Sequence, residues 1–192
     1  MSNAMCLKRT GFVTLLCAVT ANSLPAQTFN LLLYFNGTDG ATSCGTLVEA
    51  TNGYFYGTTF GGGAYGQGTI FKMTPSGTLT TLYSFESTDG AYPFAGLVQA
   101  SGRDFYGTTV YGGLSNACAF SYPGCGTVFK INQNGVHTRL YSFCSQGGSL
   151  CTDGTSPLAG LIQATNKDFY GTTNSVEPIT VGRFSRSPQA AL

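Results

Sequence analysis

The chain has 192 residues, a formal net charge of +1 and only 9% charged residues. It has no basic stripe that could neutralise phosphates, so the composition argues against nucleic-acid binding. Its 14 Phe and 11 Tyr residues argue against disorder, and its 27 glycines, which recur at regular places, argue against a membrane span.

Residues 1–26 are predicted to be an export signal. Lys8 and Arg9 supply the positive segment, residues 11–21 are apolar but too short to span a bilayer, and residues 24–26 form a small-residue cleavage site. We therefore expect a secreted or cell-surface bacterial protein with no stable membrane span once the signal is removed. The alternative is a buried N-terminal helix.

The remainder of the chain repeats itself. The string Phe-Tyr-Gly-Thr-Thr occurs at residues 55–59, 105–109 and 169–173, and a matching apolar segment precedes each copy. Self-similarity at a period of about 50 residues indicates a solenoid, a propeller or an array. The third copy lies farther along than this period because two loops, at residues 110–126 and 144–151, are longer than their counterparts.

Each repeat holds four short strand candidates that are rich in aromatic and β-branched residues and are joined by hairpin turns. The candidates in the first two repeats are residues 47–50, 55–60, 69–73, 79–85, 96–100, 105–110, 126–132 and 136–143. Four strands per repeat match a propeller blade. We predict an all-β fold of repeated four-stranded antiparallel units, a partial or incomplete β-propeller of about three blades. An open β-solenoid-like stack is the alternative.

Large apolar side chains should fill the contacts between neighbouring units, because one blade cannot bury both of its faces. The residues expected there are Phe105, Tyr106, Phe129, Leu140 and Phe143.

The repeat domain is predicted to span residues 27–173, followed by a degenerate tail at 174–192. Residues 29–35 match only the fourth strand of a repeat. Within the tail, aligning Gly182 with Gly68 predicts a degenerate third strand at residues Ile179–Phe184.

The two ends of the chain could then complete one composite blade, which gives three blades in total. Propellers typically need about four to eight blades to close. We therefore expect a truncated member of a longer array, a homo-oligomer that completes a ring, or an open stack.

Four cysteines bracket the two longer loops in equally spaced pairs. We predict disulfides Cys118–Cys125 and Cys144–Cys151, which agree with export to an oxidising compartment. A disulfide that closes so short a loop contributes roughly 2–3 kcal/mol. A four-cysteine metal site is the alternative.

Cys44 aligns with Phe94 and Leu158, which are apolar. A buried free thiol is expected at this position.

The joint pattern resembles the GloVer tandem repeat. It is carried by Tyr106-Gly-Thr-Thr109, Gly112-Gly113, Gly126-Thr-Val-Phe-Lys130, Leu140-Tyr-Ser-Phe143, Asp153-Gly154 and Pro157-Leu-Ala-Gly-Leu161. The resemblance covers residues 29–173. It implies an exported bacterial protein at the surface or outside the cell, and it supplies no catalytic residues to transfer.

A Thr-Asp-Gly triplet recurs once per repeat, with its carboxylates at Asp39, Asp89 and Asp153. These aspartates are expected to stabilise turns by bonding nearby backbone amides. A shared cation or ligand site is the alternative, although one carboxylate per loop falls short of the 6–8 oxygen ligands that calcium takes.

Other polar residues are assigned structural positions. The paired threonines of each copy are expected to make cross-strand hydrogen bonds, with an axial hydroxyl-lined channel as the alternative. Lys72 and Lys130 are expected on a solvated strand edge, and His137 on the surface of a strand.

The sequence thus predicts a non-catalytic structural or binding scaffold without a metal or other cofactor. Its ligand is not identified, and an extracellular glycan or protein is the expected class of partner. One alternative is a propeller-type carbohydrate-active enzyme, for which Asp104, Asp168 or the three triplet aspartates would supply the carboxylate pair. The other is a non-functional fragment of a longer repeat protein.

Overall fold

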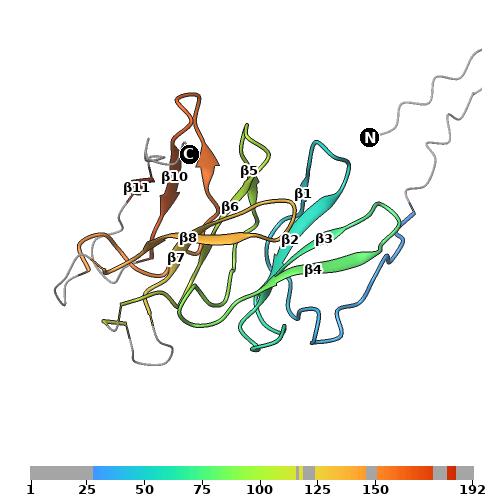
Figure 1. Cartoon of the computed structure of the whole chain (residues 1–192), viewed down its shortest axis with the longest axis horizontal. Helices are drawn as coiled ribbons and strands as arrows, with labels where there is room; N and C mark the ends of the chain where they lie inside the picture. The colour runs from blue at the N-terminus through green and yellow to red at the C-terminus, as the bar shows by residue number, and fades with distance from the viewer. Residues whose placement is uncertain (1–27, 116, 119–123, 146–150, 175–180, 185–192) are drawn as a thin grey trace, which may run out of the picture. The chain divides into compact units, whose positions relative to one another are not determined.

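The computed structural model describes residues 28–115, 117–118, 124–145, 151–174 and 181–184, so the predicted signal lies outside the described residues. The described part of the chain is all-β and contains no helix. Eleven strands follow one another along the chain (Figure 1). Their bounds are β1 Val48–Glu49, β2 Phe55–Thr59, β3 Thr69–Met73, β4 Leu79–Ser84, β5 Val98–Gln99, β6 Phe105–Thr109, β7 Thr127–Ile131, β8 His137–Ser142, β9 Ile162–Gln163, β10 Phe169–Thr172 and β11 Val181–Phe184.

The strands form three antiparallel sheets in which chain neighbours are also sheet neighbours. Two sheets have four strands, in the orders β1-β2-β3-β4 and β5-β6-β7-β8, and the third has the order β11-β10-β9. The predicted all-β class with repeated four-stranded antiparallel units is confirmed. This blade-like arrangement is consistent with a partial propeller.

The two complete sheets share their register residue for residue. Gly57 pairs with Phe71 in the first sheet, and Gly107 pairs with Phe129 in the second. Each sheet also carries a bulge immediately before that Phe, where the third strand pairs with the fourth. The repeated sequence therefore specifies the irregularity as well as the strands.

The third sheet corrects the alignment of the degenerate strand. Because Gly171 pairs with Gly182, Gly182 stands at the place of Phe71 and Phe129 and is not the counterpart of Gly68. The same register puts Arg183 at the place of a lysine in the other two sheets. Residues 28–36 form no strand, so the expected composite blade is not formed among the described residues.

The core lies between neighbouring sheets, and aromatic stacking connects it. The ring of Tyr56 stacks on Phe105 with centroids 4.1 Å apart, and Tyr106 stacks on Phe169 at the same distance. In the second sheet, therefore, Phe105 faces the preceding sheet and Tyr106 faces the next one. Stacked rings contribute about 0.5–1.5 kcal/mol beyond the area that they bury.

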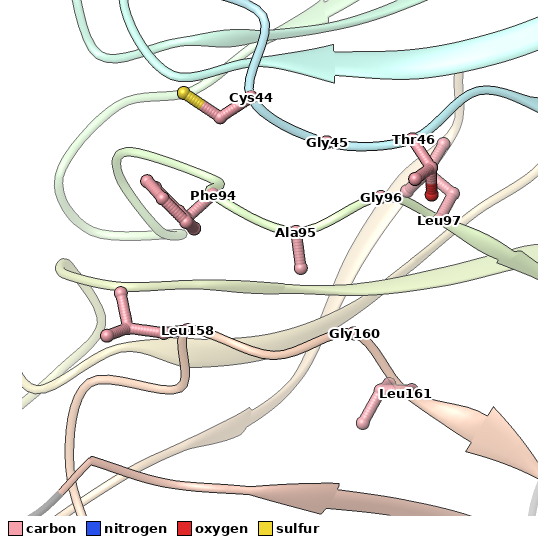
Figure 2. A pocket seen from close by; sticks show the side chains of 10 residues that line it. All are labelled: Cys44, Gly45, Thr46, Phe94, Ala95, Gly96, Leu97, Leu158, Gly160 and Leu161. Atoms are coloured by element: carbon pink, nitrogen blue, oxygen red, sulfur yellow. The ribbon is translucent and has the colours of Figure 1, made fainter. Parts of the chain in front are cut away.

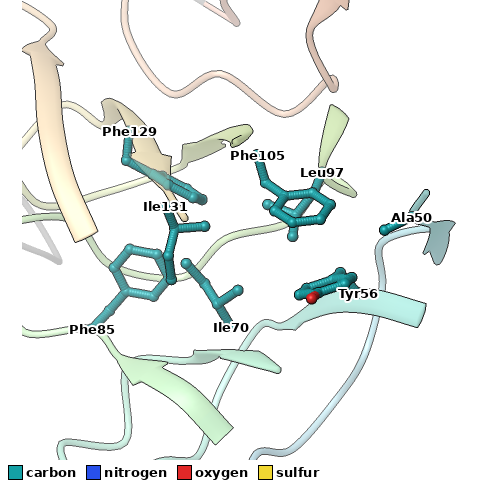
Figure 3. Close-up of a cluster of buried hydrophobic side chains, with 8 residues drawn as sticks. All are labelled: Ala50, Tyr56, Ile70, Phe85, Leu97, Phe105, Phe129 and Ile131. Atoms are coloured by element: carbon teal, nitrogen blue, oxygen red, sulfur yellow. The ribbon is translucent and has the colours of Figure 1, made fainter. Parts of the chain in front are cut away.

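The first core cluster joins the first and second sheets (Figure 3). Its buried members are Ala50, Tyr56, Ile70, Phe85, Leu97, Phe105, Phe129 and Ile131. The second cluster, with Tyr106 and Phe169, joins the second and third sheets, and Leu140 and Phe143 pack against it. The five predicted contact residues therefore all lie in, or against, these two clusters.

The glycine of each repeated string makes room for this core. A Cβ atom on Gly107 would lie 2.6 Å from Cζ of Phe129 and 3.0 Å from Cδ2 of Leu97. Gly57 stands equally close to the ring of Phe71. Glycine is required here because the third-strand ring crosses directly over the second strand.

The threonines make the expected hydrogen bonds. The hydroxyl oxygens of Thr59 and Thr69 lie 2.8 Å apart across neighbouring strands, and those of Thr109 and Thr127 lie 2.7 Å apart. All four residues are buried. The preceding threonine, Thr58, donates to the carbonyl of Ala95 in the approach to the next sheet, so these hydroxyls stabilise the frame.

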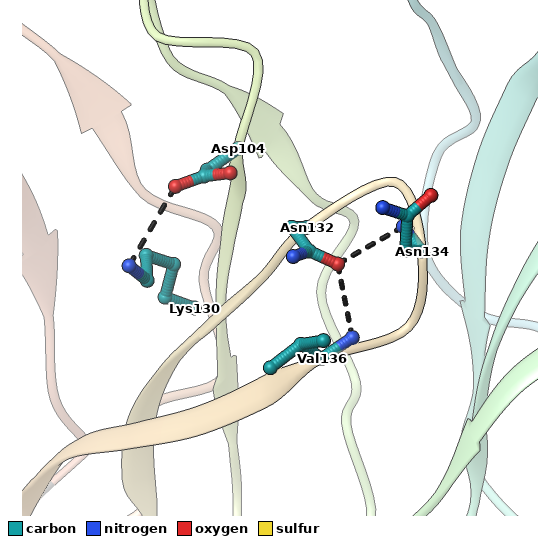
Figure 4. Close-up of polar contacts among 5 residues, drawn as sticks. All are labelled: Asp104, Lys130, Asn132, Asn134 and Val136. Atoms are coloured by element: carbon teal, nitrogen blue, oxygen red, sulfur yellow. Dashed lines mark hydrogen bonds and ion pairs between the residues drawn. The ribbon is translucent and has the colours of Figure 1, made fainter.

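The prediction of a strand edge for the two lysines was wrong. Lys72 and Lys130 lie on β3 and β7, which are interior strands. Lys130 forms an ion pair with Asp104 at 3.6 Å (Figure 4), whereas Lys72 lies over the ring of Tyr54. The adjoining turn depends on Asn132, whose Oδ1 accepts hydrogen bonds from two backbone amides (Figure 4).

The close approach at Gly107 yields a stability prediction. Gly107→Ala should destabilise the protein by about 1–3 kcal/mol, because its methyl group overpacks the buried Phe129 ring. Urea unfolding measures the loss. Gly102→Ala is the matched control, because a Cβ at Gly102 meets no atom within 4 Å. Equal stability of the two variants would contradict the steric account.

Candidate functional site

The chain connections divide between two ends of the sheets. In an antiparallel meander, the turns between strands one and two and between strands three and four lie at one end. The connection from strand two to three, and the connection from strand four to the next sheet, lie at the other. We call the second end the connector end. Both longer loops, residues 110–126 and 144–151, belong to it.

The triplet aspartates organise turns at the connector end. Oδ1 of Asp39 accepts a hydrogen bond from the amide of Asn36, and Oδ2 of Asp153 accepts one from the amide of Cys144 at 2.8 Å. Asp153 also accepts from the Tyr141 hydroxyl at 2.7 Å, and Asp89 accepts from Tyr83 in the same way. Each carboxylate thus bonds its own turn, and those of Asp89 and Asp153 also accept from a tyrosine of the strand before it.

Burial shifts the titration of the pair formed by Tyr83 and Asp89. It raises the pKa of the Asp89 carboxyl, and the hydrogen bond from Tyr83 partly opposes that shift. Burial, followed by the hydrogen bond to Asp89, raises the pKa of the Tyr83 hydroxyl. The raised pKa of Tyr83 keeps its hydroxyl protonated, as a donor to Asp89 requires.

A strained residue follows each triplet, and the sequence did not reveal it. Thr42, Tyr92 and Ser156 have φ values of 57°, 57° and 49°, in the left-handed region that non-glycine residues rarely occupy. The carbonyl of each accepts a hydrogen bond from the backbone amide of the residue that directly follows a Phe-Tyr-Gly-Thr-Thr string, as Phe60 does for Thr42. No glycine marks these positions, so only their equal spacing after the triplets could have indicated them.

The segments after these strained residues meet around a hollow of about 320 Å³ (Figure 2). It is lined by Cys44, Gly45, Thr46, Phe94, Ala95, Gly96, Leu97, Leu158, Gly160 and Leu161. No charged side chain is among them. The backbones approach closely here, since a Cβ on Gly96 would lie 2.6 Å from the carbonyl oxygen of Thr46.

The repeat places one equivalent side chain from each unit at the same side of this hollow. Cys44, Phe94 and Leu158 follow one another there in Figure 2. Phe94 is 42% exposed and Leu158 is 40% exposed. Cys44 is a free cysteine but an exposed one, so the expectation that it is buried was wrong. Its apolar counterparts line an opening and do not form a core.

The two longer loops are closed by the predicted disulfides. Cys118 is bonded to Cys125 and Cys144 to Cys151. The sulfur atoms of Cys118, Cys125 and Cys151 all lie within 4.8 Å of one another. The two disulfides therefore lie next to each other at the connector end. In this bonded form no thiolate of the four is available for the alternative metal site.

The carboxylates considered for catalysis occupy framework positions. Asp104 forms the ion pair with Lys130. The buried Asp168 accepts a hydrogen bond from the side-chain amide of Asn166 at 2.9 Å. Among the described residues, the cysteine cluster is the one group of three or more His, Cys, Asp or Glu side chains close enough to share an ion.

His137 is packed between sheets, and the expectation of a surface position was wrong. Its ring stacks on Tyr83 with centroids 4.2 Å apart and also contacts Phe85 and Phe129. Its Nε2 atom is buried without a hydrogen-bond partner among the described residues. Burial, with a smaller contribution from the nearby Arg139 charge, lowers its pKa to about 4.

Stacked antiparallel sheets with equivalent residues at equivalent places define a β-repeat protein. The chain belongs to the Gloeobacter/Verrucomicrobia repeat family, whose model matches residues 18–184. This confirms the resemblance to the GloVer repeat. No curated protein matches the chain. Among the described residues, no helix is long and apolar enough to cross a bilayer.

The disulfides give a second stability prediction. Replacing Cys144 and Cys151 together by Ala should lower the free energy of unfolding by about 2–3 kcal/mol, because the unfolded loop gains conformational freedom. Chemical denaturation of the oxidised protein measures the change. Cys44→Ala, which breaks no disulfide, should leave stability nearly unchanged. A comparable loss in this control would contradict the assignment.

His137 predicts a pH dependence of stability. Folding lowers its pKa from 6.5 to about 4, so on acidification the unfolded chain takes up this proton first. The contribution of neutral His137 to the free energy of unfolding is complete above pH 6.5 and is lost as the pH falls towards 4.

The matched variant is His137→Leu, because Leu79 holds the same place in β4. Unfolding free energies of the two proteins should diverge between pH 6.5 and 4, where the wild type loses stability that the variant retains. Both proteins carry Asp89, whose own titration cancels in the difference. Parallel pH profiles would show that His137 is not desolvated.

Proposed function

We propose that the protein is a secreted or cell-surface, non-catalytic scaffold that binds a neutral extracellular glycan or protein at its connector end. The hollow lined by Cys44, Phe94 and Leu158 carries the proposal, because equivalent positions of three units present partly exposed apolar side chains around one opening. Recognition sites are concave and largely apolar.

The chemistry of the lining favours an uncharged ligand. The hollow has apolar side chains, a single hydroxyl at Thr46 and exposed backbone, with no carboxylate or cation. The apolar face of a sugar ring, or an aliphatic or aromatic side chain of a protein, would suit it. The two disulfide-closed loops lie at the same end, and loops on a rigid frame commonly carry binding.

Export is supported by the predicted signal and by the two disulfides, which persist in oxidising compartments. A non-catalytic role is supported by the aspartates, since each of the described candidates is engaged in a turn, an ion pair or a hydrogen bond of the frame.

A glycan array, together with pull-down from bacterial envelope fractions by the immobilised protein, tests the proposal. Phe94→Asp should weaken any binding found by at least about tenfold, which corresponds to 1.4 kcal/mol, because it places a charge in the apolar hollow. Val136→Asp is the matched control. Val136 is 60% exposed and lies in the β7–β8 turn at the opposite end.

Retention by wild type and Val136→Asp, with loss in Phe94→Asp, is the expected result. No binding to any glycan or envelope fraction would overturn the proposal, and so would equal binding by all three proteins.

A further inference from the structure

The sequence of residues 32–35 matches that of the fourth strand of a unit, but the segment belongs to no sheet among the described residues. Leu32 and Phe35 correspond to Leu82 and Phe85, which lie at the end of β4 in the first complete unit. In the structure, however, residues 28–36 form no strand.

The contacts of this segment nevertheless match those of a fourth strand. Phe35 meets Phe71 edge-on at 5.2 Å and 65°, and Phe85 meets Phe129 at 5.2 Å and 64°.

The backbone contact with the next hairpin is equivalent too. A Cβ on Gly77 would lie 2.7 Å from the carbonyl oxygen of Leu32, and one on Gly135 would lie 2.8 Å from that of Leu82. The segment therefore lies against the first sheet as β4 lies against the second. It takes the place of the last strand of a preceding unit.

Among the described residues, no sheet pairs with this segment, and the segment is correspondingly exposed. Leu32 is 51% exposed and Tyr34 is 81% exposed, whereas Leu82 in the equivalent strand is half-buried and packs against the first core cluster. The segment is therefore an apolar stretch in the position of a fourth strand that no described strand covers.

The third sheet ends on a strand that has a neighbour on one side. β3 and β7 each pair with a strand on both sides, whereas β11 pairs only with β10 among the described residues. No described strand therefore occupies the fourth-strand position beside β11. An unpaired strand edge is a template for pairing with a second chain.

We propose that residues 32–35 of one copy of this chain pair antiparallel with β11 of a second copy and complete its third sheet. The register follows from the first unit, in which Ile70 pairs with Tyr83. Val181 stands at the place of Ile70, and Leu33 at the place of Tyr83. Leu33 of one copy therefore lies opposite Val181 of the other.

Residues 32–35 are expected to pair with β11 of a second copy, and not with β11 of their own chain, because a ring needs more units than one chain shows. Propellers typically close with about four to eight blades, whereas the described residues of one chain form two four-stranded sheets and one three-stranded sheet. The contact is head-to-tail, so it either closes into a ring or propagates. Two copies give a ring of about six units, and the assembly is a dimer. The proposal is independent of which ligand the connector end binds.

Cross-linking between separately made variants tests this pairing. In full chains with Cys6, Cys17 and Cys44 replaced by Ser, one protein carries Leu33→Cys and a larger-tagged one carries Val181→Cys. Mild oxidation of the mixture should give the mixed dimer as the main product, because a disulfide needs Cα atoms within about 7 Å. Val136→Cys mixed with Val181→Cys is the control and should give little.

Light scattering supplies the second measurement. The wild type should have the mass of two chains, and Leu33→Pro should be a monomer with unchanged circular dichroism, because proline removes a strand amide. A monomeric wild type would overturn the proposal. So would a dimer that persists in Leu33→Pro, or one that cross-links no better than the control.

Discussion

The contact on which the fold depends is the stacking of one aromatic ring on the next between neighbouring sheets. Each residue of Phe-Tyr-Gly-Thr-Thr makes a different contact. The Phe contacts the preceding sheet, the Tyr contacts the following sheet, and the Gly admits the third-strand ring. The two threonines bond the next unit and the third strand. In the second unit, which has a described neighbour on each side, these five residues thus make both of the inter-sheet stacking contacts.

The sequence predicted what periodicity can determine. The strands, their order, the two disulfides and the contact residues follow from aligning the chain with itself, because equivalent residues occupy equivalent places. Solvent exposure does not follow in the same way. Cys44 was expected to be buried because Phe94 and Leu158 are apolar, but all three line an open hollow. His137 has no counterpart of its own kind, so periodicity could not indicate the aromatic rings that surround it.

The third sheet shows why glycines alone are an unsafe guide to register. Aligning Gly182 with Gly68 uses chain distance, whereas the sheet aligns it with Phe71 through hydrogen bonding to Gly171. Glycine at both of these facing positions means that Gly171 has no third-strand ring to accommodate. Among the described residues, a Cβ at Gly171 would instead lie 2.8 Å from Cδ2 of Leu161. The close neighbour of the second-strand glycine in this unit is thus a side chain that precedes the first strand, and not a ring of the third strand.

The repeated Phe-Tyr-Gly-Thr-Thr string forms the second strand of each complete sheet, whereas the segments that differ in length between repeats lie at the connector end. Stacking, the threonine pairs and the close glycines all involve strand residues, which leaves the connections from strand two to three and from sheet to sheet free to change length. Both insertions occur there, and each is closed by a disulfide whose sulfurs adjoin those of the other. Lengthening a surface loop costs little, since loop-closure entropy grows slowly with length. The disulfide across each insertion ties together the two ends of the added segment. The added residues therefore lengthen a connection without separating the strands that it joins.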